Sequence, residues 1–209
     1  MYKKKGIIVS FEGIDGCGKT TQAKLFCKYL GKNGLDYVFL NEPGGTYTGE
    51  KIRRILLNSR NNICPLTELF LYLASRSQLV EELISPYINK GKIVVLDRYI
   101  DSTTAYQGYG RGISLKLIRY IHSFLVKDSL PDITFLIDAT ASELLSVLNN
   151  KKKDRIERES IAFQKKVRDG YLHIAKLEKK RIKVIKRKTV LLTHKQIIKE
   201  WERFINGHR

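Results

Sequence analysis

Eight consecutive residues near the start of the chain have the composition of a phosphate-binding loop. Gly13-Ile-Asp-Gly-Cys-Gly-Lys-Thr20 matches the pattern G-x-x-x-x-G-K-[ST] in full, with a strand-like run before it and a helical pattern after it. Its glycines let backbone N–H groups turn inward around phosphate oxygens at a helix N-terminus. Lys19 is expected to reach the terminal phosphates, and the Thr20 hydroxyl to ligate Mg²⁺. The loop therefore predicts a triphosphate site.

Two aspartates compete for a second place in the Mg²⁺ shell. Asp97 closes an apolar strand-like run, where the carboxylate of a Walker-B element would lie, and Asp138 ends a similar run. An aspartate at a strand end also commonly caps a helix. We favour Asp97, because Arg98 beside it brings a cation to the same cleft.

Arginines separate the possible classes of phosphate-binding protein. Five of them lie near predicted element ends or on a helix flank, namely Arg53, Arg76, Arg98, Arg111 and Arg155. A guanidinium fork suits phosphate, and a mobile arginine can stabilise a phosphoryl group during transfer. The guanine-reading N-K-x-D element of a switch GTPase is absent from the sequence, and a motor or helicase normally needs a longer chain. A small kinase fits, with a donor site at the loop and an acceptor site opposite.

The elements that must hold these residues alternate along the chain. Strand-like runs cover 7–11, 37–40, 93–96, 133–137 and, more weakly, 182–185. Helical patterns cover 19–33, 48–58, 65–89, 114–127, about 140–148, 160–180 and 193–205, and the glycine-rich run 108–112 is expected to be a loop. Near-continuous apolar strands between helices predict an α/β fold with a parallel sheet covered on both faces. We expect one domain over residues 1–209.

The helical pattern over 65–89 has two faces. Its core stripe at 3.6-residue spacing is predicted to be Leu66, Leu69, Phe70, Leu73, Val80 and Ile84. A second face about 90° away carries Tyr72, Arg76, Leu79 and Leu83, by the turn of about 100° per residue. Tyr72 and Arg76 are thus stacked one turn apart on a flank. Spacing alone leaves open whether they pack in the core or reach into a cleft.

Composition excludes several classes. The 209 residues are 43% hydrophobic, which is enough for a core, and no apolar run approaches a membrane span. Three cysteines without metal-ligand spacing favour a reduced, cytoplasmic protein. The formal charge is +18, of which residues 151–209 contribute +13. Charge of this kind is compatible with polyanionic substrates or with nucleic acid.

A nucleic-acid-binding ATPase is the alternative that the basic C-terminal quarter suggests. It predicts ATP hydrolysis that DNA or RNA stimulates and binding that falls steeply with salt. The segment, however, lacks aromatics interleaved for base stacking, since Trp201 and Phe204 lie at helical spacing. We therefore expect no specific nucleic-acid partner, and we interpret the surplus charge as a solvated surface.

Six blocks of sequence resemble one family. They are Phe11-Glu-Gly-Ile-Asp-Gly-Cys-Gly-Lys-Thr-Thr21, Glu42-Pro-Gly-Gly-Thr46, Ala74-Ser-Arg76, Asp97-Arg-Tyr-Ile-Asp-Ser102, Ala105-Tyr-Gln-Gly108 and Asp154-Arg-Ile-Glu157. Together they look like the bacterial thymidylate kinases among the P-loop nucleoside monophosphate kinases. The resemblance implies a three-layer fold with a short lid at about 149–160, a homodimer, and transfer of the ATP γ-phosphoryl group to dTMP with Mg²⁺, giving dTDP for dTTP biosynthesis.

The resemblance also implies residue roles. Nucleotide binding falls to the loop residues Gly13, Ile14, Asp15, Gly16, Cys17, Gly18, Lys19, Thr20 and Thr21. Asp15 matches the carboxylate that receives the sugar 3′-hydroxyl, Arg98 the main arginine for the acceptor phosphate, and Arg53 a second cation there. Catalysis is expected from Lys19, Arg98, Arg155 and Asp15. Arg155 lies in the lid, where bacterial members carry the arginine that their P-loop lacks.

The remaining matches concern the nucleoside of dTMP. The resemblance implies that Arg76 and Gln107 hydrogen-bond the thymine edge, with Thr103 at a neighbouring polar position. Tyr106 matches a tyrosine under the sugar, and Glu42 a residue that organises the acceptor side. Tyr72 stands where the family usually stacks phenylalanine on thymine, so the extra hydroxyl is a departure. Residues 183–188 do not match the family's adenine-side motif, and we assign no adenine contact.

Overall fold

Five parallel strands form the centre of the computed structural model, which describes residues 6–140, 143 and 154–207. Their bounds are Ile7–Glu12 (β1), Tyr37–Asn41 (β2), Ile93–Asp97 (β3), Ile133–Asp138 (β4) and Ile182–Lys186 (β5). The strand order is β2-β3-β1-β4-β5, and every pairing is parallel. The predicted parallel α/β sheet is confirmed, and β5 lies at one edge.

The strand register brings the candidate site residues together at the carboxyl ends of the strands, which form one edge of the sheet. Phe11 on β1 is opposite Asp97 on β3, and Asn41 on β2 is also opposite Asp97. Because parallel strands end at the same edge, the loop after β1 and the polar residues after β2 and β3 come together there. This edge is the crevice where open α/β sheets bind ligands.

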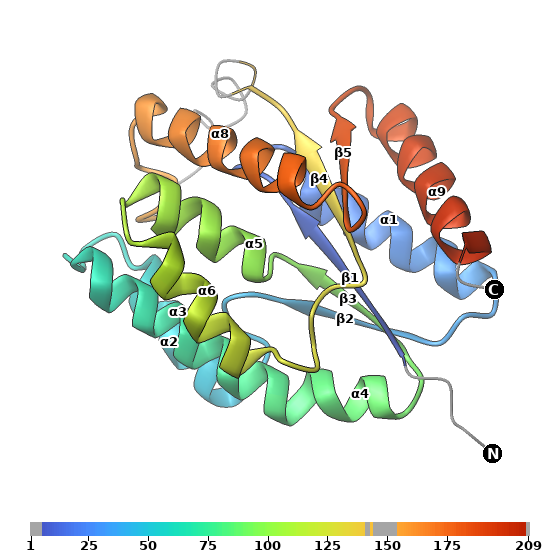
Figure 1. The fold of residues 1–209 in the computed structure, drawn as a ribbon, viewed down its shortest axis with the longest axis horizontal. Coiled ribbons are helices and arrows are strands. Elements are labelled where there is room, and N and C mark those ends of the chain that lie inside the picture. The colour runs from blue at the N-terminus through green and yellow to red at the C-terminus, as the bar shows by residue number, and fades with distance from the viewer. Residues whose placement is uncertain (1–5, 141–142, 144–153, 208–209) are drawn as a thin grey trace.

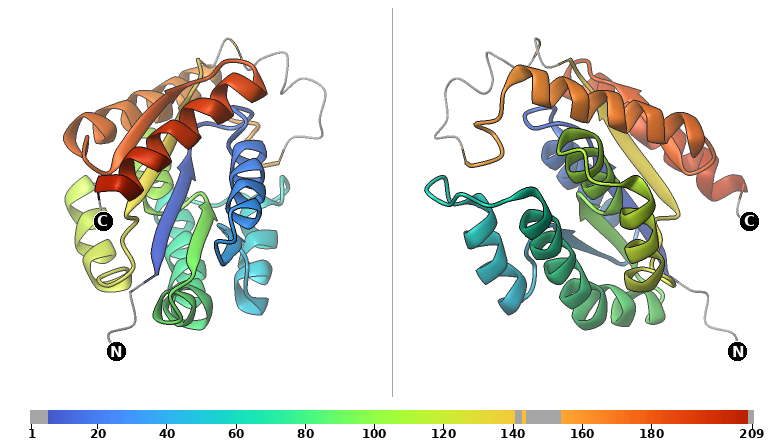
Figure 2. Two further views of the ribbon diagram at one scale, coloured as in Figure 1. Left: turned by 90° about the vertical axis from the view of Figure 1, so that its right-hand side faces the viewer. Right: turned by 60° about the vertical axis from the view of Figure 1, so that its left-hand side comes forward.

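Helices cover both faces of the sheet (Figures 1 and 2). Their bounds are Lys19–Lys32 (α1), Tyr47–Leu57 (α2), Pro65–Leu79 (α3), Val80–Ile84 (η1), Ser85–Asn89 (α4), Ile100–Thr103 (α5), Thr104–Gly110 (η2), Leu115–Leu125 (α6), Ile161–Leu177 (α8) and Val190–Gly207 (α9). α1 and α9 pack on the face that carries Val9 and Phe11, and η1 and α4 pack on the face that carries Ile8. Alternation along β1 thus sends neighbouring side chains to opposite layers.

The long helical stretch after Pro65 is confirmed but is not one regular helix. It continues from α3 through the π-helical turn η1 into α4, with Pro86 in the first turn of α4. Leu69, Leu73, Val80 and Ile84 are buried as predicted. The prediction is wrong for Leu66 and Phe70, which are 47% and 52% exposed. Periodicity identified the apolar side of α3. At the N-terminal end of this side, however, no described part of the chain packs over Leu66 and Phe70.

The glycine-rich run 108–112 is not the loop that its composition predicted. Gly108 and Gly110 belong to the helical segment η2, which α8 packs against. A Cβ on Gly110 would lie 2.8 Å from the ring of Phe163, and one on Gly108 would lie 2.5 Å from Leu115. These glycines therefore permit close helix packing, and only Gly112, with φ of 77°, ends the segment in the left-handed region.

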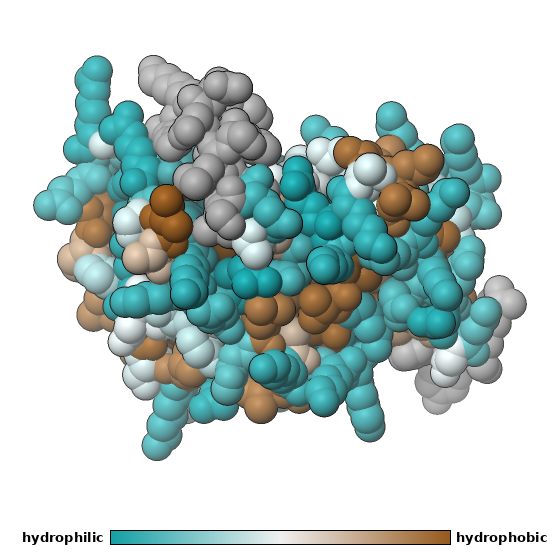
Figure 3. Space-filling view, turned by 90° about the horizontal axis from the view of Figure 1, so that it is seen from above, coloured by the Kyte–Doolittle hydropathy of each residue, from teal (hydrophilic) through white to brown (hydrophobic). Residues whose placement is uncertain are grey.

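The remaining predicted helices and strands are either confirmed or lie largely outside the described residues. The other described helices and strands for which bounds were predicted begin and end within three residues of those bounds, whereas no bounds were predicted for α5. The helix expected at about 140–148 and the first part of the lid lie largely outside the described residues. No helix among those described is both long and apolar enough to cross a membrane. Seen from above, hydrophilic residues cover most of the surface (Figure 3).

Candidate active site

The loop between β1 and α1 has the backbone of an anion cradle. Gly13, Gly16 and Gly18 have φ of 142°, 79° and 96°, a region that residues with a Cβ rarely adopt. A Cβ on Gly13 would also lie 2.6 Å from the carbonyl oxygen of Ile137 on β4. α1 begins directly after the loop at Lys19, so its first N–H groups face the cradle. The local structure is the one that the motif requires for binding phosphate.

One cavity of about 750 Å³ joins this loop to the polar ends of the neighbouring strands. Its lining includes most of the predicted site residues: Asp15, Gly16, Gly18, Lys19, Thr20, Thr21, Glu42, Arg53, Tyr72, Asp97, Arg98, Thr103, Tyr106 and Gln107. Among the described residues, the predicted positions that do not line it are Gly13, Ile14, Cys17, Arg76 and Arg155. A volume of this size is typical of sites for small organic ligands.

Arg98 lines the cavity and has a strained backbone. Its φ is 71°, and no other residue with a Cβ in the described chain has a positive φ. Such a conformation costs on the order of 1–3 kcal/mol and persists only where the surroundings enforce it. Here the Glu12 carboxylate accepts the next backbone N–H, that of Tyr99, at 2.7 Å, while the Arg98 N–H donates to the Phe11 carbonyl at 3.0 Å.

The Arg98 guanidinium is held beside the phosphate loop. It donates to Asp15 Oδ1 at 2.6 Å and to the Gly13 carbonyl at 3.1 Å, and it lies over the Tyr106 ring at 5.0 Å. Tyr106 donates its hydroxyl to Asp15 Oδ2 at 2.9 Å, and Lys19 Nζ lies 3.6 Å from Asp15 Oδ1. Burial alone would raise the pKa of Asp15, but the charges of Arg98 and Lys19 lower it to about 2. Two cations and one ionised carboxylate therefore share this part of the cavity.

Glu12, Ser102 and Tyr171 hold Arg98 in place, and the sequence analysis assigned no role to any of them. Ser102 and Tyr171 both donate to Glu12 Oε2, at 2.6 and 2.9 Å, and both hydroxyls also accept from Arg98. Burial raises the pKa of Glu12 to about 7, and the charge of Asp101 adds to the rise. Glu12 lies one residue before the loop and within the first family-like block, but nothing in the sequence gave it a role. Tyr171 comes from the distant helix α8 and has no signal of its own.

The two competing aspartates have different surroundings. Thr20 Oγ1 donates to Asp97 Oδ2, and Asp97 Oδ1 is buried with no hydrogen-bond partner among the described atoms. Asp138 instead accepts from Arg168 at 2.7 and 3.0 Å, and the cavity lining does not include it. An orphaned carboxylate oxygen beside the loop threonine fits a divalent cation, whereas the Asp138 carboxylate is already neutralised.

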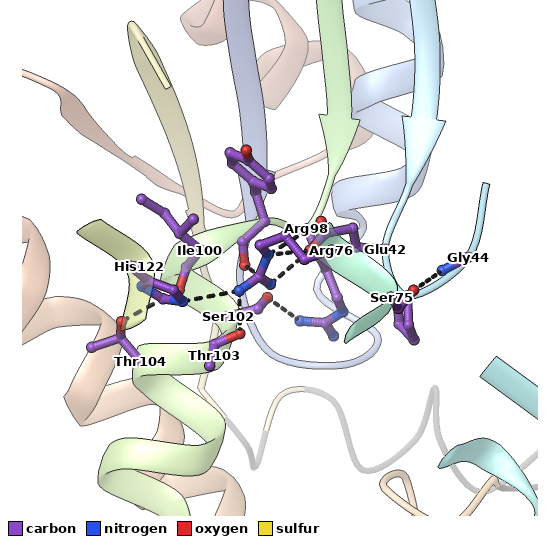
Figure 4. Close-up of polar contacts among 12 residues, drawn as sticks. Glu42, Gly44, Ser75, Arg76, Arg98, Ile100, Ser102, Thr103, Thr104 and His122 are labelled. Atoms are coloured by element: carbon purple, nitrogen blue, oxygen red, sulfur yellow. Dashed lines mark hydrogen bonds and ion pairs between the residues drawn. The ribbon is translucent and has the colours of Figure 1, made fainter. Parts of the chain in front are cut away.

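The motif Glu42-Pro-Gly-Gly-Thr46 makes a tight turn from β2 into α2. Gly44 and Gly45 have φ of 125° and 83°, and Thr46 caps α2 by accepting the Gly49 N–H at 2.9 Å. The Gly44 N–H donates to Ser75 on α3 (Figure 4). The turn brings Arg53 of α2 to the cavity, where its Nη1 donates to the Pro43 carbonyl at 2.6 Å.

Arg76 is buried rather than exposed on a helix flank, since its exposed fraction is 1%. It makes polar contacts with several neighbouring residues (Figure 4). Its Nε and Nη2 donate to Glu42, Nη2 also to the Tyr99 carbonyl, and Nη1 to Thr103 and to His122 Nε2. These contacts use all five N–H groups of the guanidinium. Contact between Arg76 and a base would require one of these bonds to be shared or broken. His122, which has no motif spacing, was not selected from the sequence.

Arg155 is held on the side of α3 in this structure. Its Nη1 lies 2.7 Å from Glu68 Oε2, and its Nε donates to the Leu56 carbonyl at 2.7 Å. Glu68 also accepts from Gln107 Nε2 at 2.9 Å. The Asp154 carboxylate accepts the N–H groups of Ile156 and Glu157, and these three residues line the cavity. The lid residues 149–153, including Lys151–Lys153, lie outside the described residues.

The sequence is similar to that of known proteins over most of its length. The family model for thymidylate kinase matches residues 11–197. The chain is 48% identical over 204 residues to a thymidylate kinase of Caldanaerobacter subterraneus subsp. tengcongensis, covering 97% of this chain and 98% of that one. A thymidylate kinase of Thermoanaerobacter sp. (strain X514) is 49% identical over 195 residues, or 93% of this chain and 96% of that one.

A solved structure gives the same result for the fold. The crystal structure of thymidylate kinase from Ehrlichia chaffeensis superposes with a TM-score of 0.79 at 36% identity, covering 95% of this chain and 99% of that chain. A parallel sheet with a phosphate loop after its central strand, opening into one shared cavity, defines a P-loop nucleotide kinase. Within that class, the chain belongs to the thymidylate kinase family.

Proposed function

We propose that this enzyme transfers the γ-phosphoryl group of ATP to dTMP, giving dTDP and ADP for dTTP biosynthesis. The observation that carries the proposal is the cavity of about 750 Å³ that joins the phosphate loop to Arg98 and Arg53 and to the polar residues Thr103 and Gln107. The thymidylate kinase relatives support the identity of the acceptor. Phosphoryl transfer depends mainly on positioning and electrostatics, so no general base is required among the lining residues.

The donor side is the loop from Gly13 to Thr21. Its backbone N–H groups would hold the ATP phosphates, and Lys19 would offset the charge on the group being transferred. Thr20 and Asp97 would hold Mg²⁺, and the orphaned Oδ1 of Asp97 supports that assignment. When bound, Mg²⁺ neutralises charge on the phosphate oxygens.

The acceptor side follows from the cations opposite the loop. Arg98 would bind the dTMP phosphate with Arg53 as a second cation, and Glu42 would keep this side organised through its ion pair with Arg76 at 2.6 Å. Asp15 would receive the sugar 3′-hydroxyl, and Tyr106 would lie under the sugar. The hydrogen bonds among Asp15, Tyr106 and Arg98 support this assignment, because they orient these three side chains relative to one another.

The base would lie against Tyr72, Thr103 and Gln107, all of which line the cavity. Gln107 would be the main contact with the thymine edge, since the donors of Arg76 are all used within the protein. Arg76 would then contribute by fixing Glu42 and Thr103, and would reach the base only after giving up a bond. Arg155 is paired with Glu68 in this structure. It would have to leave Glu68 before it could act on the phosphates.

A panel of nucleoside monophosphates in a coupled ADP-release assay tests the proposal. We expect turnover with dTMP that requires ATP and Mg²⁺, weaker turnover with dUMP and none with dCMP. Arg98→Ala should mainly impair use of the acceptor phosphate, and Lys19→Ala should impair transfer itself. Preferred turnover of dCMP or of an unphosphorylated nucleoside would overturn the assignment.

We further propose that the enzyme is a homodimer. Five apolar side chains that are exposed in the single chain gather on the neighbouring helices α3 and α6, namely Leu66, Phe70, Leu117, Tyr120 and Phe124. Tyr120 and Phe124 are 62% and 68% exposed, and their rings pack edge to face at 4.9 Å. This α3/α6 patch is apolar and exposed, and it suits a second copy of the chain. A cytoplasmic location belongs to the same proposal, which the three free cysteines support.

A further inference from the structure

Glu68 is a buried carboxylate that links three parts of the base end of the site. Its side chain is 1% exposed, although Glu68 lies in the first turn of α3. It accepts from Gln107 Nε2 at 2.9 Å, from Arg111 Nε and Nη2 at 3.1 Å each, and from Arg155 at 2.7 Å. Neither the motifs nor the roles proposed above account for it.

The carboxylate is ionised. Burial alone would raise the pKa of Glu68, but hydrogen bonds from Arg111 and Gln107, together with the charges of Arg111 and Arg155, lower it below its ordinary value. The geometry gives the same answer, because two guanidinium groups donate to the one carboxyl group. An ionised carboxylate has only acceptor atoms.

This fixes which way the Gln107 amide faces. Only the NH₂ group of the amide can pair with an acceptor, so Nε2 must face Glu68 and Oε1 must lie on the other side of the planar amide. Gln107 is 2% exposed and lines the cavity with Tyr72 and Thr103. The amide atom on the side away from Glu68 is therefore the oxygen, a hydrogen-bond acceptor.

We propose that Glu68 is a positioning residue that determines base specificity: by orienting the Gln107 amide, it makes the site select pyrimidines that carry a proton on N3. Thymine and uracil present an N3–H donor, whereas N3 of cytosine is an acceptor and would face Oε1 lone pair to lone pair. A polar site of this kind discriminates strongly, since a mismatched base leaves buried groups unpaired. The inference rests on the proposed function, because it takes Gln107 to meet the pyrimidine edge.

Glu68→Gln tests this inference directly. A glutamine at this position is similar in size but can offer Gln107 either an acceptor or a donor, so the Gln107 amide is free to turn over. We expect turnover of dCMP to become measurable, with a ratio of kcat/KM for dCMP to that for dTMP at least about tenfold above the detection limit that bounds the wild type. The ratio for dUMP to dTMP should stay unchanged, since both bases carry N3–H. General loosening of the pocket would move both ratios.

Two further variants test whether Glu68 affects base specificity through Gln107. Glu159→Gln removes another carboxylate that pairs with Arg111, at 2.6 Å, and it should leave the dCMP ratio unchanged. In a Gln107→Ala background, adding Glu68→Gln should not change the ratio, because no amide remains to turn. If Glu68→Gln does not fold, Glu68→Gln with Arg111→Gln removes one buried charge of each sign and is measured in the same way.

The outcomes separate this inference from the proposed function. Wild-type turnover of dTMP with an unchanged dCMP ratio in the folded Glu68 variants would overturn the role of Glu68 and leave the kinase assignment intact. A rise of the dCMP and dUMP ratios together would also overturn it. A wild-type enzyme that does not turn over dTMP would overturn the proposed function itself.

Discussion

Thr20 Oγ1 donates to Asp97 Oδ2 across 2.5 Å, which joins the end of the phosphate loop to the end of β3 and leaves Asp97 Oδ1 buried without a partner. A hydroxyl and a carboxylate at this point are oxygen ligands of the type that Mg²⁺ binds beside nucleotide phosphates. We therefore expect Asp97→Asn to raise the Mg²⁺ concentration that gives half-maximal activity by about 10- to 100-fold. A Mg²⁺ titration at saturating ATP and dTMP measures the shift.

Asp138→Asn is the matched control for that substitution. Asp138 ends the strand on the other side of β1, but its carboxylate is bound to Arg168 and is outside the cavity. Its variant should lose some stability and keep the wild-type Mg²⁺ dependence. An equal shift in both variants would contradict the assignment of Asp97 to the cation.

Arg53 and Arg54 offer a second matched pair on α2. Arg53 lines the cavity, whereas its neighbour Arg54 is exposed. A charged hydrogen bond to the acceptor phosphate contributes about 1.5–3 kcal/mol, so Arg53→Ala should raise the KM for dTMP about tenfold or more. The KM for ATP should change little, because the proposed site of the donor phosphates is the loop after β1. Initial rates with each substrate varied in turn separate the two effects.

Arg54→Ala should leave both KM values near wild type. Thermal unfolding of the two variants then tests whether Arg53 acts only through the Glu42–Thr46 turn, whose Pro43 carbonyl it binds. A fall in melting temperature without a change in KM for dTMP would assign Arg53 a structural role instead of acceptor binding.

The parts of the site that the sequence predicted are those built from neighbouring residues. The phosphate loop is one continuous motif, and its glycines, Lys19 and Thr20 lie where the pattern requires. Asp97 and Arg98 could be placed because a parallel strand delivers its last residues to the same edge as the loop. Local pattern and register together therefore account for the phosphate end of the cavity.

The base end depends on contacts between distant residues, for which no local pattern exists. Gln107 and Glu68 are 39 positions apart, and Arg76 and His122 are 46 apart. Spacing placed Arg76 on a flank, but only the packed structure shows that protein groups use all its donors. In the same way, periodicity placed Leu66 and Phe70 on the apolar side of α3 without showing that this end of the helix is uncovered.

The exposed α3/α6 patch leads to a prediction about assembly. Phe124, at 68% exposed, is its most exposed member. Buried aromatic anchors contribute about 2 kcal/mol or more to an interface, and a charge in their place adds a desolvation cost. Phe124→Glu should therefore weaken dimerisation about 30-fold or more, as measured by sedimentation across a concentration series.

Leu177→Glu serves as the control for that experiment. Leu177 is 69% exposed at the end of α8 and is not part of the α3/α6 patch. Its variant should sediment like the wild type. Dimers that persist in Phe124→Glu, or that are lost in Leu177→Glu, would place the interface on another face.

The buried contact between Arg76 and His122 makes stability depend on pH. His122 Nε2 accepts from Arg76 Nη1 at 3.0 Å, and burial together with the Arg76 charge lowers the pKa of His122 to about 3. The unfolded chain binds a proton at its ordinary value of 6.5, whereas the folded chain does not until about 3. Stability therefore falls as pH drops below 6.5.

His122→Gln keeps an acceptor for Arg76 and removes the titration. Between pH 7.5 and 5.5, the wild type should lose about 1.4 kcal/mol more unfolding free energy than this variant. Urea unfolding at the two pH values measures the difference. His173→Gln, at an exposed histidine on α8, should lose as much as the wild type. If the His122 variant kept the wild-type pH dependence, His122 would have to bind a proton in the folded protein. That result would contradict the hydrogen bond that His122 accepts from Arg76.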